Sequence, residues 1–212
     1  MDPPVITLRE ELAAISQGTT GLRTWEAALR FTEVMISRPD IIRDRCVLEL
    51  GAGMGLVGLA GAMLGARSVW MTDVNEQVLR RLSENVDLNR PLLEQGSGSL
   101  ASVSALDWEG FDAADPRWER AVDTVICTDV TYDPSIVSAL VRVLDFYLAR
   151  GATGWMAATI RQPETFELFV SCLSDADIKY SKLDVDAIPK WFYHEEEIAG
   201  VVVLQMTKDV VP

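Results

Sequence analysis

Histidine and cysteine are scarce in this sequence. Its 212 residues contain one histidine, His194, and three cysteines, Cys46, Cys127 and Cys172, with no Cys-x-x-Cys spacing. Zinc sites and disulfide frameworks need clusters of such residues. We therefore expect no metal site and no disulfide, but free thiols buried in apolar segments of a protein from a reducing compartment.

Positive charge is also in short supply. The sequence has 19 Lys and Arg against 32 Asp and Glu, which gives a net charge of −13. A nucleic-acid surface needs clustered Lys and Arg to bind phosphates, so the composition argues against a direct nucleic-acid partner. The acidity is compatible with a basic protein or peptide partner, although in most proteins it serves only solubility.

Long hydrophobic runs are missing as well. No apolar segment approaches the roughly 20 residues of a membrane-spanning helix, and the first residues lack the charged-then-apolar pattern of a secretion signal. With 49% hydrophobic residues, a chain of this length suits one domain with a sizeable core. We expect a cytoplasmic, monomeric domain without a membrane partner.

Apolar strands alternate with amphipathic helical segments along the chain. Strands are expected over 46–50, 68–72, 101–106, 122–128, 154–160, 179–185 and 200–207. Helices are expected from Thr24, as N-cap, to before Pro39, and over 56–64, 76–89, 134–149 and 163–176. The segment 5–16 suits an edge strand or a short helix, and 91–99 a mobile polar loop. This alternation predicts a doubly wound α/β sheet, whose ligands bind at the carboxyl ends of the strands.

The expected strand over 46–50 runs directly into a glycine-dense turn that opens the next helix. Four glycines recur between positions 51 and 58, and glycine is needed where backbone takes a positive φ or closely approaches a ligand. The turn therefore predicts a cradle for a nucleotide-type cofactor. The pattern Gly53-x-Gly55-x-x-Gly58, followed by Asp73, also fits a dinucleotide fingerprint. The glycine spacing alone leaves the cofactor open.

Glu49 bears on this choice because it lies two residues before Gly51 and, by strand alternation, near the mouth of the turn. A carboxylate there would repel the pyrophosphate of a dinucleotide. S-adenosylmethionine has no phosphate and carries an ammonium and a sulfonium, with which an acidic residue is compatible. Glu49 therefore favours the methyl donor, although it could instead hold the loop through backbone hydrogen bonds.

Further polar and aromatic residues lie where strands are expected to end. Asp73 suits the ribose hydroxyls of a cofactor, or could be the N-cap of the following helix. Trp108 could offer a flat face to adenine, with Asp107 accepting from the exocyclic amine, or be a core residue. Trp25 lies on an amphipathic segment, so the residues alone favour a packing role for it.

The fourth strand ends in Asp129-Val130-Thr131-Tyr132. Asp129 could orient an incoming amine, while the ring of Tyr132 could line a channel for its alkyl stem. Asp129 could also be a turn or cap residue before Pro134. Enzymes that methylate adenine or glutamine carry Asn/Asp-Pro-Pro-Tyr/Phe at this place, so the lack of the two prolines argues against those acceptors.

Taken together, these segments resemble a known family. The landmarks are 18–28 (GTTGLRTWEAA), 47–56 (VLELGAGMGL), 106–108 (LDW), 129–132 (DVTY) and 161–165 (RQPET). With them the chain resembles the seven-β-strand, class I S-adenosylmethionine-dependent protein-lysine methyltransferases, and within these the elongation factor 2 lysine methyltransferases. The resemblance implies a mostly parallel, Rossmann-like sheet of seven strands with helices on both faces. In it the antiparallel strand over 200–207 would lie between strands five and six.

The resemblance also implies an activity and roles for single residues. A methyl group would pass by direct displacement from S-adenosylmethionine to a lysine of elongation factor 2, leaving S-adenosylhomocysteine, without a metal or a covalent intermediate. Asp129 and Tyr132 would form the catalytic, acceptor end, with Phe192 or Tyr193 shaping the channel unless these two only pack. The residues expected to bind the cofactor are Trp25, Glu49, Gly51, Ala52, Gly53, Gly55, Asp73, Asp107, Trp108 and Thr128.

The chain departs from the family pattern in places. Thr128 stands where alanine is common and Thr131 where an apolar residue is common, which predicts a slightly more polar channel. Family members carry a further region before the catalytic domain, so we expect this chain to represent that domain alone. Residues 1–212 would form a single methyltransferase domain, with 1–23 as a lead-in and 24–212 as the catalytic core.

Other classes of function stay open at this point. The chain could be an interaction protein that holds the cofactor with little catalysis, or a methyltransferase for a small molecule. A nicotinamide-dependent oxidoreductase suits the glycine spacing, but the sequence has no Tyr-x-x-x-Lys pair, and Glu49 argues against it.

Overall fold

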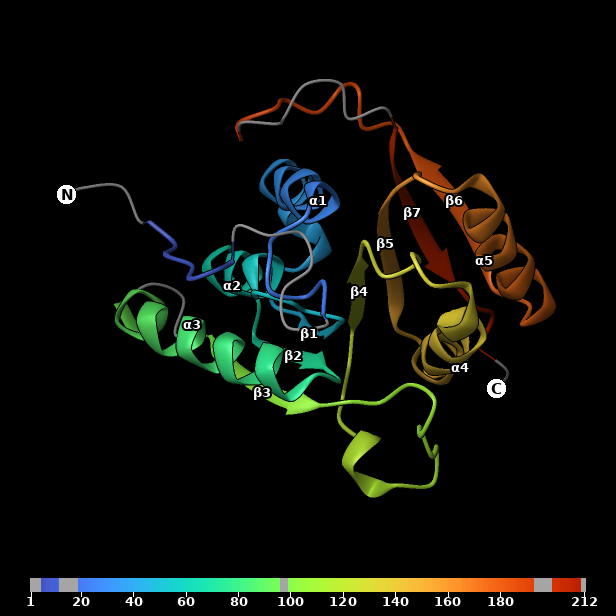
Figure 1. Cartoon of the computed structure of the whole chain (residues 1–212), viewed down its shortest axis with the longest axis horizontal. Helices are drawn as coiled ribbons and strands as arrows, with labels where there is room; N and C mark the ends of the chain where they lie inside the picture. Colours follow the sequence, from blue (N-terminus) through green and yellow to red (C-terminus); the bar gives the residue numbers. More distant parts are fainter. Residues whose placement is uncertain (1–4, 12–18, 96–98, 193–199, 211–212) are drawn as a thin grey trace.

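A seven-stranded sheet organises the computed structural model of the chain, which describes residues 5–11, 19–95, 99–192 and 200–210. The strand order is β3-β2-β1-β4-β5-β7-β6 (Figure 1). The strands are β1 Cys46–Leu50, β2 Ser68–Asp73, β3 Leu100–Ala105, β4 Thr124–Thr128, β5 Thr153–Thr159, β6 Lys179–Leu183 and β7 Val201–Thr207. The predicted strands are thus confirmed, and β7 lies antiparallel between β5 and β6 as the resemblance implied.

Helices cover both faces of this sheet. They are α1 Glu26–Ser37, α2 Leu56–Met63, α3 Glu76–Gln95, α4 Val137–Leu148 and α5 Pro163–Asp175. Residues of α1, α2 and α3 form one buried cluster, and residues of α4 and α5 form the other. Strand β1 contributes side chains to both clusters, because Val47 faces the first while Leu48 and Leu50 face the second. This double burial explains why the central strands read as continuous apolar runs.

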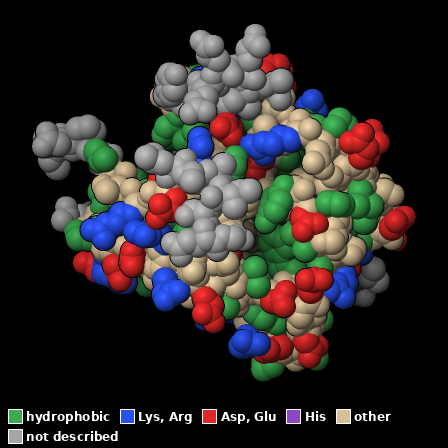
Figure 2. Space-filling model, viewed as in Figure 1, with side chains coloured by type: hydrophobic (Ala, Val, Ile, Leu, Met, Phe, Trp, Pro, Cys, Tyr) green, Lys and Arg blue, Asp and Glu red, His purple; other side chains and the backbone are tan. Residues whose placement is uncertain are grey.

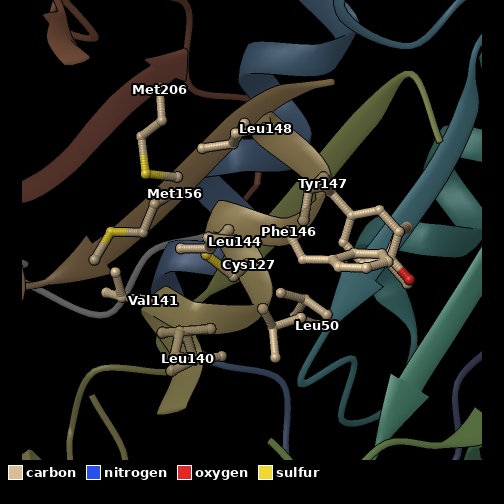
Figure 3. Packing of buried hydrophobic residues seen from close by; sticks show 14 of the residues in the cluster. Leu50, Cys127, Leu140, Val141, Leu144, Phe146, Tyr147, Leu148, Met156 and Met206 are labelled. Carbon is tan, nitrogen blue, oxygen red and sulfur yellow. The ribbon is translucent and has the colours of Figure 1, made fainter. Parts of the chain in front are cut away.

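The packing against α4 illustrates the second cluster (Figure 3). Leu140 and Leu144 of α4 lie over Leu50, Cys127 and Met156 from three neighbouring strands. Cys127 is fully buried, as predicted for the cysteines, whereas Cys46 and Cys172 are only half-buried. Because both layers interdigitate, the carboxyl ends of β1, β2 and β4 are held at one edge of the sheet.

Helix α3 is longer than the sequence suggested. It continues through Pro91 to Gln95, so the loop predicted to begin at 91 is wrong up to that point. Leu93 extends the buried face of Leu82 and Val86, and this packing maintains the helix despite the missing N–H of proline. Residues 96–98 of the predicted loop lie outside the described part of the chain.

Residues 5–11 adopt neither of the expected forms, being neither strand nor helix. Their backbone is instead bound by two buried asparagines of α3. Asn89 accepts from Thr7 N and donates to Thr7 O, at 2.9 and 2.8 Å. Asn85 accepts from Arg9 N at 2.8 Å and donates to its carbonyl at 3.2 Å. Side-chain amides thus supply the hydrogen bonds of a strand partner. Residues 12–16 of this segment are outside the description.

Charged side chains are distributed rather than concentrated. On the face of Figure 2, Asp and Glu are scattered among Lys and Arg. Within the described ranges, no helix is long and apolar enough to cross a membrane.

Candidate active site

A cavity of about 380 Å³ opens at the carboxyl ends of β1, β2 and β4. The residues that the sequence predicted to be catalytic or to bind the cofactor all line it. These are Trp25, Glu49, Gly51, Ala52, Gly53, Gly55, Asp73, Asp107, Trp108, Thr128, Asp129 and Tyr132. The segment before α1 adds Thr19, Thr20 and Arg23 to the wall. The topology therefore brings together positions that are more than a hundred residues apart in sequence.

The glycine turn lies directly after β1 and keeps backbone exposed to the cavity. Gly51 has φ +68°, and a Cβ there would lie 2.7 Å from Val130 Cγ1 and 3.6 Å from the Trp108 ring. Gly58, in the first turns of α2, is equally constrained, since its Cβ would lie 2.6 Å from Glu49 Oε2. Side chains at these positions would clash with the walls, so glycine is required for close packing around the site.

Asp73, at the end of β2, holds the turn in place. Its Oδ2 accepts from Gly53 N at 3.2 Å, and its Oδ1 accepts from Val74 N and Asn75 N at 2.8 and 3.1 Å. Burial raises the pKa of this carboxyl, and the backbone N–H groups partly offset the rise. The N-cap role that the sequence left open for Asp73 belongs to Asn75, whose Oδ1 accepts from Gln77 N at 2.9 Å.

Glu49 presents a buried, unsatisfied oxygen to the site. Its side chain is buried, yet Oε2 has no hydrogen-bond partner among the described residues. Burial raises its pKa to about 8, Gly58 N–H works against this, and the charge of Asp73 adds to it. The alternative in which Glu49 braces the loop is met in part, because the Gly58 N–H acts on this carboxyl, but it leaves Oε2 unpartnered at a cavity wall.

Two tryptophans line the cavity. Trp25 is half-buried at the N-cap position of α1, and its Nε1 donates to Thr20 O at 3.0 Å. It therefore lines the cavity rather than the helix core. Trp108 is also half-buried, beside Gly51, and Asp107 is exposed next to it with Oδ1 accepting from Glu109 N at 3.0 Å. One carboxylate and two aromatic faces thus remain accessible from the cavity.

Asp129 is a shielded carboxylate in the wall of the cavity. The residue has φ +52°, and its side chain is only 6% exposed. Oδ1 accepts from Thr159 N at 2.8 Å, while Oδ2 accepts from Thr159 Oγ1 at 3.1 Å and from Ala27 N at 3.3 Å. Arg161 Nη1 lies 3.5 Å from Oδ1. Burial raises the pKa of Asp129, whereas Thr159, Arg161 and Ala27 lower it.

A second, smaller cavity of about 90 Å³ lies on the other side of Asp129. Its walls are Asp129, Thr131, Tyr132, Thr159, Arg161 and Gln162. Tyr132 is 57% exposed at the rim and borders both cavities. The turn role considered for Asp129 is met by Asp133, which accepts from Ser135 N at 2.9 Å at the 3₁₀ helix Pro134–Ile136. Asp129 is thus left at the junction of the two cavities.

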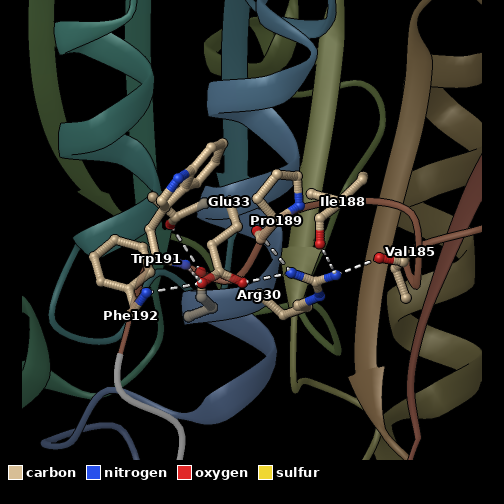
Figure 4. Close-up of polar contacts among 9 residues, drawn as sticks. Arg30, Glu33, Val185, Ile188, Pro189, Trp191 and Phe192 are labelled. Atoms are coloured by element: carbon tan, nitrogen blue, oxygen red, sulfur yellow. Dashed lines mark hydrogen bonds and ion pairs between the residues drawn. The ribbon is translucent and has the colours of Figure 1, made fainter.

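Some residues near the site were not recognised from sequence. Thr159 holds both oxygens of Asp129, and the only signal for it is its place at the end of the strand next to β4. Arg161 was noted only as a landmark. Phe192 is not among the residues lining either cavity, since its backbone N–H donates to Glu33 of α1 at 2.9 Å (Figure 4). Tyr193 lies outside the described residues.

Comparison with known proteins bears directly on this arrangement. The sequence profile of the family described as "Lysine methyltransferase" matches residues 2–176, which include the residues predicted to be catalytic or to bind the cofactor. The chain belongs to this lysine methyltransferase family. Its fold is the Rossmann-like sheet of seven strands that the resemblance implied.

Curated relatives from this family are longer than the chain. It is 38% identical to the protein-lysine N-methyltransferase EEF2KMT of Homo sapiens, over 91% of this chain and 61% of the relative. It is 35% identical to the protein-lysine N-methyltransferase EFM3 of Chaetomium thermophilum, over 81% of this chain and 52% of the relative. The chain thus spans less than two thirds of the length of these proteins.

Solved structures support the same fold at low sequence identity. The glycopeptide N-methyltransferase MtfA, in complex with S-adenosylmethionine, superposes with a TM-score of 0.60 at 11% identity, covering 85% of this chain and 87% of that one. A putative RNA methyltransferase, PH1948 from Pyrococcus horikoshii, gives 0.56 at 17% identity, over 96% and 94%. At these identities the likeness concerns the fold alone.

Proposed function

We propose that this member of the lysine methyltransferase family is an S-adenosylmethionine-dependent protein-lysine N-methyltransferase, with a lysine of translation elongation factor 2 as acceptor. Residues 24–212 would be the catalytic core of a single domain, preceded by the lead-in 1–23. The relatives named EEF2KMT and EFM3 support the activity and the protein substrate. The observation that carries the proposal is the buried, unpartnered Oε2 of Glu49 at the wall of the larger cavity.

The residues present fit S-adenosylmethionine. The turn at Gly51 and Gly53 offers backbone without side chains for the methionine part, and Glu49 offers a carboxylate for its ammonium. A dinucleotide would bring its pyrophosphate to the same turn, where its negative charge would oppose ionisation of Glu49 and Asp73 and would offer no ion pair to either carboxyl. When bound, the cofactor supplies an electrophilic methyl group on its sulfonium. The fit therefore favours the methyl donor over the nicotinamide cofactors.

The other wall residues suit the remaining parts of the cofactor. Asp73 would accept from the ribose hydroxyls, although its oxygens already hold the turn. The Trp108 face would stack with adenine, and Asp107 beside it would accept from the exocyclic amine. Trp25 and Thr128 would complete the wall, with Ala52 and Gly55 keeping the turn close.

The protein's own part in transfer would be positioning. Asp129 and Tyr132 lie where the two cavities meet, so they would orient the ε-amine toward the methyl group and shape the path of its alkyl stem. Burial of Asp129 limits competing water at this point. The amine must lose its proton before it attacks, and the half-open second cavity leaves solvent access for that proton.

The test is a labelling experiment with elongation factor 2. The chain is incubated with the factor and isotope-labelled donor, and methylated lysines are identified by mass spectrometry. Label on one lysine of the factor supports the proposal. Thermal stabilisation by S-adenosylhomocysteine without label on any protein of a lysate would point to a cofactor-holding interaction protein, and stabilisation by NAD alone would overturn the cofactor assignment. We further propose that the protein works in the cytoplasm as a monomer, without nucleic acid or membrane.

A further inference from the structure

The side chain of Arg161 lies in a site built for a cation. It follows β5, and its guanidinium is bound from two sides, with Nη1 3.5 Å from Asp129 Oδ1 and Nη2 3.2 Å from Glu26 Oε2. Its Cζ lies 5.0 Å from the centre of the Trp25 ring. Two carboxylates and an aromatic face are the groups that proteins use to hold ammonium and guanidinium ions.

Arg161 is also the most exchangeable partner of Asp129. The other donors, Thr159 N, Thr159 Oγ1 and Ala27 N, lie at 2.8 to 3.3 Å and belong to the ends of β5 and α1. The Arg161 contact is longer, and its side chain is 45% exposed while that of Asp129 is 6% exposed. A flexible, half-exposed side chain can leave without breaking the backbone contacts that fix the carboxylate.

Asp129 and Arg161 also line the smaller cavity. Asp129, Tyr132 and Arg161 form its wall together, so a lysine that approaches Asp129 through it meets the guanidinium. An ammonium and a guanidinium repel each other within a few ångströms, and the Asp129 side chain, only 6% exposed, offers little room for both. Entry of the acceptor therefore requires Arg161 to move out of this site.

We propose that Arg161 is a specificity-determining residue that occupies the cation site of the acceptor lysine as an internal competitor and is exchanged for it. This rests on the function proposed above. The exchange replaces one cation by another, so the shielded carboxylates of Asp129 and Glu26 keep a positive partner while the lysine enters. A free amine gains too little to displace Arg161, whereas a lysine on a docked protein surface brings additional binding energy. The competitor thus selects protein-borne lysines over free cations.

The test titrates n-butylammonium, which carries the end of a lysine side chain, into the protein saturated with S-adenosylhomocysteine. The indole N–H signal of Trp25 reports binding in ¹H–¹⁵N spectra. Arg161→Gln should bind the probe at least about tenfold more tightly than the unmodified protein, and Arg161→Lys should resemble the latter. Adding Asp129→Asn to Arg161→Gln should remove the gain. Equal affinity for S-adenosylhomocysteine in all variants verifies that they are folded.

The matched control is Arg38→Gln. Arg38 is also 45% exposed and pairs with a carboxylate, Asp40, but at the opposite end of α1. It should bind the probe like the unmodified protein. Arg161→Gln binding no more tightly than this control would overturn the proposal. So would an equal gain for neutral n-butanol, because that would mean only a larger cavity.

Kinetics separate this proposal from the proposed function. With elongation factor 2 as acceptor, Arg161→Gln should lower KM severalfold and leave kcat undiminished. A fall in kcat at unchanged KM would overturn the competitor role, since it would make Arg161 a residue required for transfer. If the unmodified protein methylates no protein at all, the proposed function fails, and the n-butylammonium titration still decides whether Arg161 fills a cation site.

Discussion

The carboxylate of Asp129 caps a helix that lies 102 residues earlier in the chain. Its Oδ2 accepts from Ala27 N at 3.3 Å in the first turn of α1, where neither Thr24 nor Trp25 supplies a side-chain cap. The Thr24 cap expected from sequence is therefore wrong. Because Trp25 immediately precedes α1, this contact ties the proposed acceptor end of the site to the wall of the larger cavity.

Removing the charge of Asp129 should separate transfer from cofactor binding. In Asp129→Asn we expect methyl transfer to fall by about 100-fold, because the acceptor amine loses its orienting carboxylate. Affinity for S-adenosylhomocysteine should change little by calorimetry, and asparagine tolerates the φ of +52° at this position. Asp133→Asn, an exposed carboxylate in the same loop, is the control and should transfer normally. Full activity in Asp129→Asn would refute the role of Asp129.

Glu49 should make the stability of the protein depend on pH. Its folded pKa of about 8 lies above the ordinary value of 4.5, so the folded state holds a proton that the unfolded state has released between these values. Its stabilising contribution is complete below about pH 4.5 and is lost as the pH rises toward 8. Relative to Glu49→Gln, the wild type should lose on the order of 1 kcal/mol of unfolding free energy per pH unit there. Urea unfolding of both proteins between pH 5 and 8 measures this, and parallel curves would contradict it.

The same carboxyl should release a proton when the cofactor binds. Near pH 7 it is mostly protonated in the free protein, since its pKa is about 8, and an ammonium placed beside it favours the carboxylate. Calorimetric titration of S-adenosylhomocysteine in two buffers of different ionisation enthalpy should give different apparent heats. Glu49→Gln should bind more weakly, with heats that no longer differ by this proton. If the apparent heats of the wild type were identical in the two buffers, Glu49 would not be the group that binds the ammonium.

Two glycines of α2 should respond in opposite ways to alanine. A Cβ on Gly58 would lie 2.5 Å from Met71 and 2.6 Å from Glu49 Oε2, so Gly58→Ala should lower stability by roughly 1–3 kcal/mol and weaken cofactor binding. A Cβ on Gly61 would meet only Ile42 and Val69, at 3.9 and 4.0 Å. Gly61→Ala should therefore stabilise the helix by up to about 1 kcal/mol. Thermal unfolding and S-adenosylhomocysteine titration distinguish the two. An equal response would mean that the space around Gly58 is not limiting.

The elements of the sheet could be predicted from sequence because their signals are local. The strand Cys46–Leu50 was predicted with its observed bounds, since it is a short apolar run ended by a glycine turn. The end of α3 could not be predicted this way, because the residue that extends it past Pro91, Leu93, does so through tertiary packing. Local breakers are weaker evidence than a buried face that continues beyond them.

The candidate site shows the same division. Glu49, Asp73 and Asp129 could be assigned to one cavity from sequence, because parallel strands place their carboxyl ends at one edge. The hydrogen-bond partners of Asp129 could not be predicted from sequence. Thr159 N–H and Arg161 reach it only because of the register between β4 and β5 and the course of the loop after β5. The order of strands in the sequence predicts at which edge of the sheet a residue lies. Its hydrogen-bond partners there are known only from the three-dimensional structure.

A buried ion pair on α1 should stabilise the segment that precedes β7. Arg30 Nη1 and Glu33 Oε2 are 2.6 Å apart, and Arg30 donates to the carbonyls of Val185, Ile188 and Pro189 (Figure 4). Glu33 Oε1 in turn accepts from Trp191 N at 2.6 Å. The pair thus binds the segment 185–191, between β6 and β7, to helix α1, which begins at the site.

Glu33→Ala should therefore be strongly destabilising, by about 3–5 kcal/mol, because it leaves Arg30 as an uncompensated buried charge. The fastened segment should also loosen, so trypsin should cleave after Lys190 faster than in the wild type at equal folded fraction. Glu84→Ala is the matched control, since Arg81 and Glu84 have the same spacing but are 33% and 53% exposed, and solvent-accessible pairs contribute at most about 1 kcal/mol. Urea unfolding with limited proteolysis measures both variants. Similar losses in the two would mean that burial adds nothing to the Arg30–Glu33 pair, and unchanged cleavage after Lys190 would mean that the segment is held by other contacts.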